Sequence, residues 1–102
     1  MKKLSLLFLL SGCLAIALPA KAAGDVAAGK DKSEKCADCH GDDGRGDEDT
    51  PALAGMPVSY FISAMEEYKN GDRKHKKMVK VAKKLSDQDF ADLAAYYKSL
   101  PK

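Results

Sequence analysis

The clearest hydrophobic pattern lies near the C-terminus, where apolar residues recur every three or four positions, as on one face of a helix. Ser86 is a suitable N-cap residue and Asp89 follows three positions later, so the two approximate a capping box. The pattern predicts a helix that begins after Ser86, runs to about Ser99 and is stopped by Pro101. Its apolar face comprises Phe90, Leu93, Ala94, Tyr97 and Leu100.

Two earlier segments also have helical features. Pro57 favours a helix start and Asn70-Gly71 a helix end, and the apolar stripe between them includes Phe61, Met65 and Tyr68. A weaker apolar face predicts a first helix over residues 25–36. Residues 42–50 and 72–84 are rich in charge and poor in apolar side chains, and both are predicted to be loops. With no strand pattern around these elements, the fold class is expected to be all-α.

The N-terminus has the features of an export signal. Lys2 and Lys3 precede an apolar run from Leu4 to Leu18, and Ala20-Lys21-Ala22 offers the small-x-small pattern of a cleavage site. The run is shorter than the roughly 20 residues that a membrane-spanning helix needs. Residues 1–22 are therefore predicted to be a signal peptide and residues 23–102 a single domain. A retained anchor is one alternative, and a lipobox ending at Cys13 is another, in which that cysteine would be lipidated.

Composition limits what such a domain can do. After cleavage about 80 residues remain, and a domain of this size usually needs a disulfide, metal or cofactor to complete its core. The chain has four Tyr, three Phe and no Trp, which argues against a multidomain enzyme with a large cleft. Loss of Lys2, Lys3 and Lys21 removes three of 17 basic residues and none of 15 acidic ones. The resulting charge is near −1, which gives no support for nucleic-acid binding.

Two cysteines and a histidine carry the candidate chemistry. Cys36, Cys39 and His40 fit the C-x-x-C-H pattern of covalent haem attachment, in which two thiols join the porphyrin edge and the imidazole lies under the iron. A disulfide and a redox C-x-x-C motif are alternatives, although a thioredoxin-like site needs a βαβ context. A zinc site that includes His75 is a third, although adjacent Cys39 and His40 would crowd a tetrahedral centre.

Haem iron would leave a sixth coordination position to fill. The candidates are Met56, Met65, Met78 and His75. Met65 belongs to the apolar stripe of the middle helix and is expected in the core. His75 stands among basic residues and is expected to be exposed. Met78 is the apolar residue of the charged segment 72–84 that could also bind a metal, and ligation of iron from a loop would explain its presence.

Residues 24–100 resemble a small bacterial class I cytochrome c, and also one half of a dihaem class I cytochrome. The resemblance is carried, in order, by 24–30, Cys36–Gly41, Pro51–Gly55, Asn70–Arg73 and Leu85–Tyr97. It implies a small class I cytochrome c fold, with three to four helices wrapped around one covalently attached haem c. Two departures from the family pattern are the Lys77 and Val79 neighbours of Met78 and the lack of any Trp.

The resemblance also implies roles for individual residues. His40 would be the proximal ligand of the iron and Met78 the distal ligand. The Pro51 carbonyl would accept a hydrogen bond from the proximal imidazole, and Leu53 would pack on the haem. Cys36 and Cys39 would form the thioethers.

The implied function is that of a periplasmic one-electron carrier and not an enzyme. An electron-entry haem subunit of a larger oxidoreductase is the alternative, and a ligand-binding sensor with Met78 displaced is a third. Partners would be redox proteins of unknown identity, with membrane association only if Cys13 is lipidated.

Overall fold

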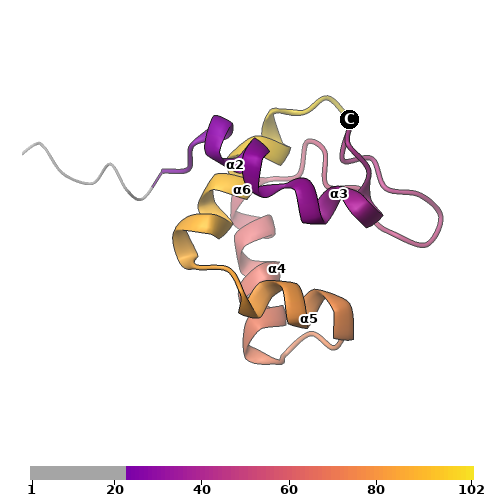
Figure 1. Ribbon diagram of the computed structural model, residues 1–102, viewed down its shortest axis with the longest axis vertical. Coiled ribbons are helices and arrows are strands. Elements are labelled where there is room, and N and C mark those ends of the chain that lie inside the picture. The colour runs from indigo at the N-terminus through magenta and orange to yellow at the C-terminus, as the bar shows by residue number, and fades with distance from the viewer. Residues whose placement is uncertain (1–22) are drawn as a thin grey trace, which may run out of the picture.

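The computed structural model describes residues 23–102, all of whose regular structure is helical (Figure 1). The predicted signal segment, including Cys13, lies outside the described residues. The all-α prediction is confirmed, and the described part of the chain contains five helices where three to four were expected. They are α2 (Val26–Lys32), α3 (Glu34–His40), α4 (Val58–Asn70), α5 (Lys76–Lys83) and α6 (Asp87–Ser99).

The predicted first helix is in fact two short helices that meet at Ser33. This residue is the C-cap of α2 and the N-cap of α3, and its hydroxyl donates a hydrogen bond to the Lys30 carbonyl at 2.7 Å. Serine side chains compete in this way with the hydrogen bonds of a continuous helix. The second helix continues beyond Cys36 to His40 and ends at Gly41, where φ is +88°.

The prediction of a loop over residues 72–84 is wrong, because α5 occupies most of this segment. His75 is its N-cap, and the ring Nδ1 accepts a hydrogen bond from the Met78 backbone at 3.4 Å. The helix packs against α4 through an apolar face that is spaced at intervals of three and four residues. Met78 and Ala82 of the helix, together with Leu85 just after it, pack in the core cluster.

The core is organised around α6, which packs against both α2 and α4 (Figure 1). Phe90, Leu93 and Tyr97 of α6 are its largest fully buried side chains. Phe61 of α4 stacks on Tyr97 with ring centroids 5.9 Å apart. Met65 is also buried, as the sequence pattern predicted. The predicted capping box of α6 is present, because Ser86 and Asp89 each accept a hydrogen bond from the other's backbone N–H.

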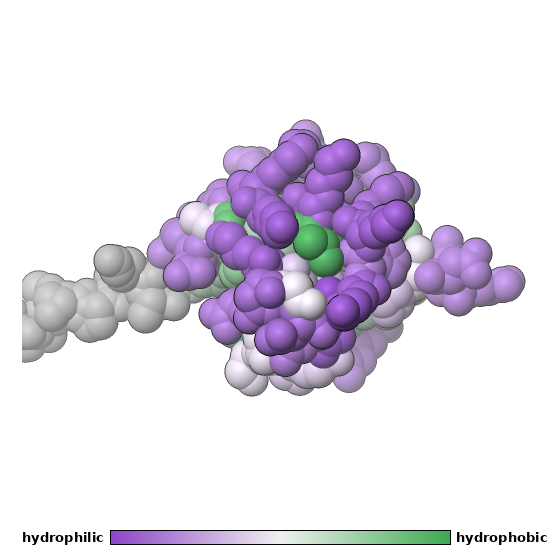
Figure 2. All heavy atoms as spheres, turned by 90° about the horizontal axis from the view of Figure 1, so that it is seen from below, coloured by the Kyte–Doolittle hydropathy of each residue, from purple (hydrophilic) through white to green (hydrophobic). Residues whose placement is uncertain are grey.

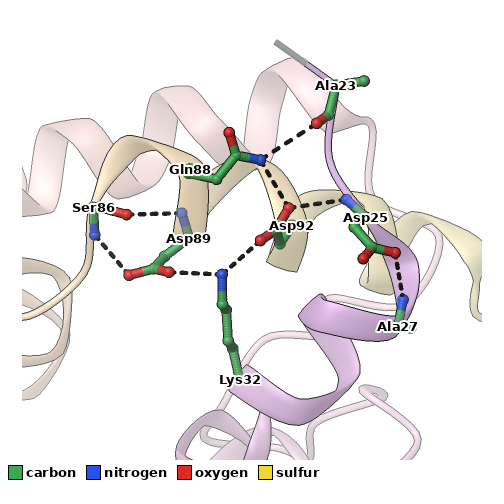
Figure 3. A network of polar contacts seen from close by, with 8 residues as sticks. All are labelled: Ala23, Asp25, Ala27, Lys32, Ser86, Gln88, Asp89 and Asp92. Carbon is green, nitrogen blue, oxygen red and sulfur yellow. Dashed lines mark hydrogen bonds and ion pairs between the residues drawn. The ribbon is translucent and has the colours of Figure 1, made fainter. Parts of the chain in front are cut away.

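The contact of α2 with α6 is both close and polar. A side chain at Gly29 would place its Cβ only 2.0 Å from the Asp92 carbonyl oxygen, so the backbones can approach only because glycine is there. The buried Asp92 carboxylate accepts hydrogen bonds from the Asp25 backbone at 2.9 Å and from Lys32 Nζ at 2.5 Å (Figure 3). Gln88 contributes a third at 2.9 Å. The carboxylate thereby ties the start of α2 to α6.

Across residues 23–102, no helix has the length and apolar character needed to cross a bilayer.

Candidate functional site

His40 is the last residue of α3, and its ring is almost fully buried. Its Nδ1 lies 2.8 Å from the carbonyl oxygen of Pro51. A carbonyl can only accept a hydrogen bond, so Nδ1 carries the proton in this contact and Nε2 keeps its lone pair. Such a bond orients a histidine and makes it a better metal ligand. The contact between His40 and Pro51 that the family resemblance implies is therefore present.

The loop after α3 holds the Pro51 carbonyl in place. The Gly46 backbone donates to the His40 carbonyl at 2.8 Å, and a Cβ at Gly46 would lie 2.7 Å from the Pro51 oxygen. Gly46 also has a φ of +66°, in the left-handed region that glycine favours. Asp47 stabilises the tip of the loop by accepting hydrogen bonds from the backbones of Asp49 and Thr50, each at 2.9 Å. Glycine at position 46 thus allows the loop to close over the imidazole.

The two cysteines lie on the same helix as His40. Positions three and four residues apart share a helix face, so Cys36, Cys39 and His40 project from one side of α3. Both cysteines are free thiols; Cys36 is half-buried and Cys39 is exposed. Burial raises the pKa of the Cys36 thiol, which keeps it in the neutral form at neutral pH. Such a face presents two thiols and one imidazole to the same bound group.

The remaining predicted site residues lie on the loop after α3 and on α5, and α5 packs against α4 and not against α3. Leu53 of the loop and Met78 of α5 are partly buried, and both pack against the core cluster that Cys36 also contacts. Met56 lies in the same partly buried layer. Cys36, Leu53 and Met78 therefore pack against one core cluster, whereas Cys39, Pro51 and His75 are exposed. The sequence prediction of an exposed His75 is confirmed.

The zinc alternative lacks geometric support in the part of the chain that the structure describes. No three His, Cys, Asp or Glu side chains between residues 23 and 102 converge on a point where they could hold a metal ion together.

One polar group near the site was not identified from the sequence. Periodicity placed Tyr97 on the apolar face of α6, and the residue is indeed 1% exposed. Its hydroxyl, however, has no hydrogen-bond partner among the described residues. The only signal available in the sequence was the choice of Tyr at a position where Phe or Leu would fill a core equally well.

An all-helical domain that presents C-x-x-C-H on one helix face, with the histidine oriented by a carbonyl, defines a c-type haem protein. Residues 26–101 match the cytochrome c family model, and the chain belongs to this family. It is 46% identical over 81 residues to cytochrome c-554(548) of Halomonas halodenitrificans, an alignment covering 76% of this chain and 98% of that protein. The helical fold is that of the class I cytochromes c.

The cytochromes c4 are also similar but longer. Over 81 residues the chain is 44% identical to cytochrome c4 of Pseudomonas aeruginosa, covering 78% of this chain and 40% of that protein. The crystal structure of reduced recombinant cytochrome c4 from Pseudomonas stutzeri superposes with a TM-score of 0.73 at 36% identity. That match covers 78% of this chain and 47% of the other. The chain thus spans less than half the length of these cytochromes c4.

A more distant relative has been named as part of an enzyme. The cytochrome subunit of sulfide dehydrogenase from Chlorobaculum tepidum is 33% identical over 70 residues, covering 69% of this chain and 64% of that subunit.

Members of the family carry covalently bound haem c, and the residues present here fit that group. Two free thiols and an imidazole share one face of α3, and the imidazole keeps a ligating nitrogen because its other nitrogen is bonded to Pro51. Cys36 and the partly buried Leu53 pack against the same core cluster. The buried Tyr97 hydroxyl is unpartnered beside the same cluster, which is consistent with a core completed by a bound group.

Proposed function

We propose that this chain is a periplasmic one-electron carrier with one covalently bound haem c whose axial ligands are His40 and Met78. The observation that carries the proposal is the hydrogen bond from His40 Nδ1 to the Pro51 carbonyl, formed on the same helix as Cys36 and Cys39. It orients the buried imidazole and leaves Nε2 free to ligate.

Each site residue has a distinct task in this proposal. Haem c supplies reversible one-electron chemistry at its iron. Cys36 and Cys39 hold the porphyrin edge through thioethers, and His40 ligates on one side. On the other side Met78 offers a soft sulfur from α5, which favours the ferrous state. Leu53, which is partly buried against the core cluster, would pack on the haem and exclude water from it. Two protein ligands leave no open position for a substrate, which suits a carrier better than a catalyst.

A second candidate function is an electron-entry haem subunit of a larger periplasmic oxidoreductase. It is supported by the similarity to the cytochrome subunit of sulfide dehydrogenase. The two functions differ in what the native protein is bound to. A free carrier would purify alone, whereas a subunit would co-purify with a larger catalytic chain in stoichiometric amounts.

Periplasmic location depends on the N-terminal segment. We propose that residues 1–22 are removed during export, so the mature chain starts at Ala23. The mass of the mature protein tests this, because cleavage after Ala22 and lipidation of Cys13 give different masses. A mass that includes residues 1–22 would contradict both forms of processing.

Removal of the thiols tests the attachment. Cys36→Ser and Cys39→Ser are each expected to leave at most one thioether, and the double variant none. The measurement is haem retained by the protein through acetone-acid extraction, after expression with a cytochrome c maturation system. Cys13→Ser is the matched control, since it removes the third cysteine and should leave retention unchanged. Extraction of all haem from the wild type would refute covalent attachment.

A further inference from the structure

Tyr97 is a fully buried side chain that lies beside Cys36 of the proposed attachment site. Its ring is held from three sides, by Phe61 at 5.9 Å between ring centroids, by Tyr96 at 5.1 Å and by Gly44 of the loop. A Cβ at Gly44 would lie only 3.0 Å from Cδ1 of Tyr97, so the loop backbone rests on the ring. These contacts fix where the hydroxyl lies, and it has no hydrogen-bond partner among residues 23–102.

A buried hydroxyl without a partner is costly and uncommon in native proteins, so it calls for an explanation. The polar side chains beside the Tyr97 hydroxyl are Cys36 and Ser33, which are close enough to influence its pKa without being in hydrogen-bonding geometry. The Ser33 hydroxyl already donates its proton to the Lys30 carbonyl. Burial raises the pKa of Tyr97, so its hydroxyl remains protonated and able to donate over the whole neutral range.

The chemistry of the neighbouring sulfur supplies the missing partner. A thiol can act as a weak donor or a weak acceptor, whereas a thioether has no proton and can only accept. Once Cys36 is joined to haem, the Tyr97 hydroxyl would therefore face a sulfur that only accepts. We propose that Tyr97 is a positioning residue of the haem site, whose hydroxyl donates a hydrogen bond to the Cys36 thioether sulfur. This inference rests on the proposed function, because it requires haem at Cys36.

Such a hydrogen bond has two measurable consequences. It fixes the Cys36 side chain and with it one edge of the porphyrin, so its loss lowers the melting temperature of the haem-loaded protein. The donor also withdraws electron density from a sulfur joined to the haem, which favours the reduced state. Hydrogen bonds around a haem are among the features through which proteins set its potential. Loss of the hydroxyl should therefore lower the midpoint potential.

The test compares Tyr97→Phe with Tyr96→Phe in the haem-loaded protein. Both variants remove one hydroxyl from adjacent residues of α6 and keep the ring. Tyr96 is the matched control because its Cβ lies beside Gly29 of α2, whereas the Tyr97 hydroxyl lies beside Cys36. Haem retention through acetone-acid extraction is measured first, then the midpoint potential and the melting temperature. We expect retention in all three proteins, with both quantities lowered in Tyr97→Phe and the potential unchanged in Tyr96→Phe.

The other outcomes overturn the inference in distinguishable ways. If Tyr97→Phe has the wild-type potential, with an equal or higher melting temperature, the hydroxyl is only an unsatisfied group and its removal relieves a cost. If the melting temperature falls while the potential stays constant, the role of Tyr97 is structural. In both cases covalent haem in the wild type leaves the proposed function standing. Absence of covalent haem from the wild type would overturn the function and the inference together.

Discussion

The two proposed iron ligands, His40 and Met78, are supported by different kinds of contact. His40 is buried and held by a hydrogen bond of 2.8 Å to a loop carbonyl, so its orientation does not depend on the metal. Met78 is only half-buried, and α5 holds it through packing on the core cluster. A methionine in such a position has rotamer freedom, so the sulfur can adjust toward a ligand at little cost. The imidazole side of the site is therefore preformed to a greater degree than the thioether side.

Replacement of Met78 tests the second axial ligand. Met78→Ala should abolish the weak sulfur-to-iron charge-transfer band in the far red of the oxidised protein. It should also open the iron to carbon monoxide and lower the potential, because a soft ligand that favours ferrous iron is lost. Axial ligands shift haem potentials over a range of order 0.8 V, so the change should greatly exceed measurement error.

Two other methionines serve as controls for that experiment. Met65 is 4% exposed, so Met65→Ala should destabilise the fold by about 2–5 kcal/mol while the band persists. Met56 is partly buried at the edge of the same cluster and is the nearest rival as ligand. A band that survives in Met78→Ala and disappears in Met56→Ala would show that the assignment of the ligand is wrong.

At the scale of helices, the contact of α2 with α6 depends on a buried carboxylate. Lys32 and the Asp25 backbone both donate to Asp92, and they hold its pKa at about 2, below the ordinary 3.8 (Figure 3). A depressed pKa means that the folded state favours the ionised carboxylate. The stabilisation is therefore complete above about pH 4 and is lost as the pH falls toward 2.

Replacement of this carboxylate by a neutral side chain should remove its contribution to the pH dependence of the free energy of unfolding. Asp92→Asn is expected to be less stable than the wild type at pH 6 by on the order of 1–2 kcal/mol, reduced from the full linkage value because Lys32 is partly exposed. The difference should shrink as the pH approaches 2. Asp87→Asn, at an exposed position in the first turn of α6, is the matched control. The free energy of unfolding by denaturant at several pH values measures both, and a difference that stays constant with pH would contradict the linkage.

The helices differ in how far the sequence could predict them. A capping box starts α6 and a proline follows it, whereas a proline starts α4 and a glycine follows it. Because these signals are local in the sequence, the bounds of both helices could be predicted, and they are confirmed. The break at Ser33 could not be foreseen, since it depends on a side chain turning back to the Lys30 carbonyl. The charge of segment 72–84 concealed α5, although Met78, Val81, Ala82 and Leu85 have helical spacing.

The site was predictable where a short motif encodes it and less so where distant segments meet. C-x-x-C-H identifies Cys36, Cys39 and His40 directly. The hydrogen bond between His40 and Pro51 joins residues 11 positions apart, and only the resemblance to a family predicted it. The unpartnered hydroxyl of Tyr97 was beyond prediction, because periodicity shows that a residue is buried but not which polar groups its neighbours offer.

For the molecule as a whole, charge is distributed unevenly. The outer face of α5 and the turn before it form a basic groove of about 690 Å³ that contains no acidic residue. Figure 2 views the molecule from this end and shows a mostly hydrophilic surface around a small hydrophobic patch. The loop after α3 carries the opposing acidic residues, all exposed. The groove is lined by Gly71, Arg73, Lys74, His75, Lys76, Val79, Lys80 and Lys83.

This distribution predicts that association with an acidic redox partner depends on salt. Lys76→Glu combined with Lys77→Glu should slow electron transfer to such a partner at low ionic strength, because opposite charges steer the encounter. The effect should fade at high salt as the charges are screened. Lys30→Glu combined with Lys98→Glu is the control, since it makes the same change of charge at exposed positions of α2 and α6. Stopped-flow rates of electron transfer that do not vary with ionic strength would show that these lysines do not steer the redox partner.

The contact between α2 and α6 also affects the order in which the core forms during folding. Asp25 and Asp92, which it joins, stand 67 positions apart, and α6 is the last helix to be synthesised. A contact of such long range forms only after the intervening chain is complete. Until α6 docks, Tyr97 cannot lie beside Cys36, and that thiol stays open to solvent, as Cys39 is even in the folded domain. Docking of the last helix therefore limits access to Cys36, and we expect haem to be attached there before α6 docks.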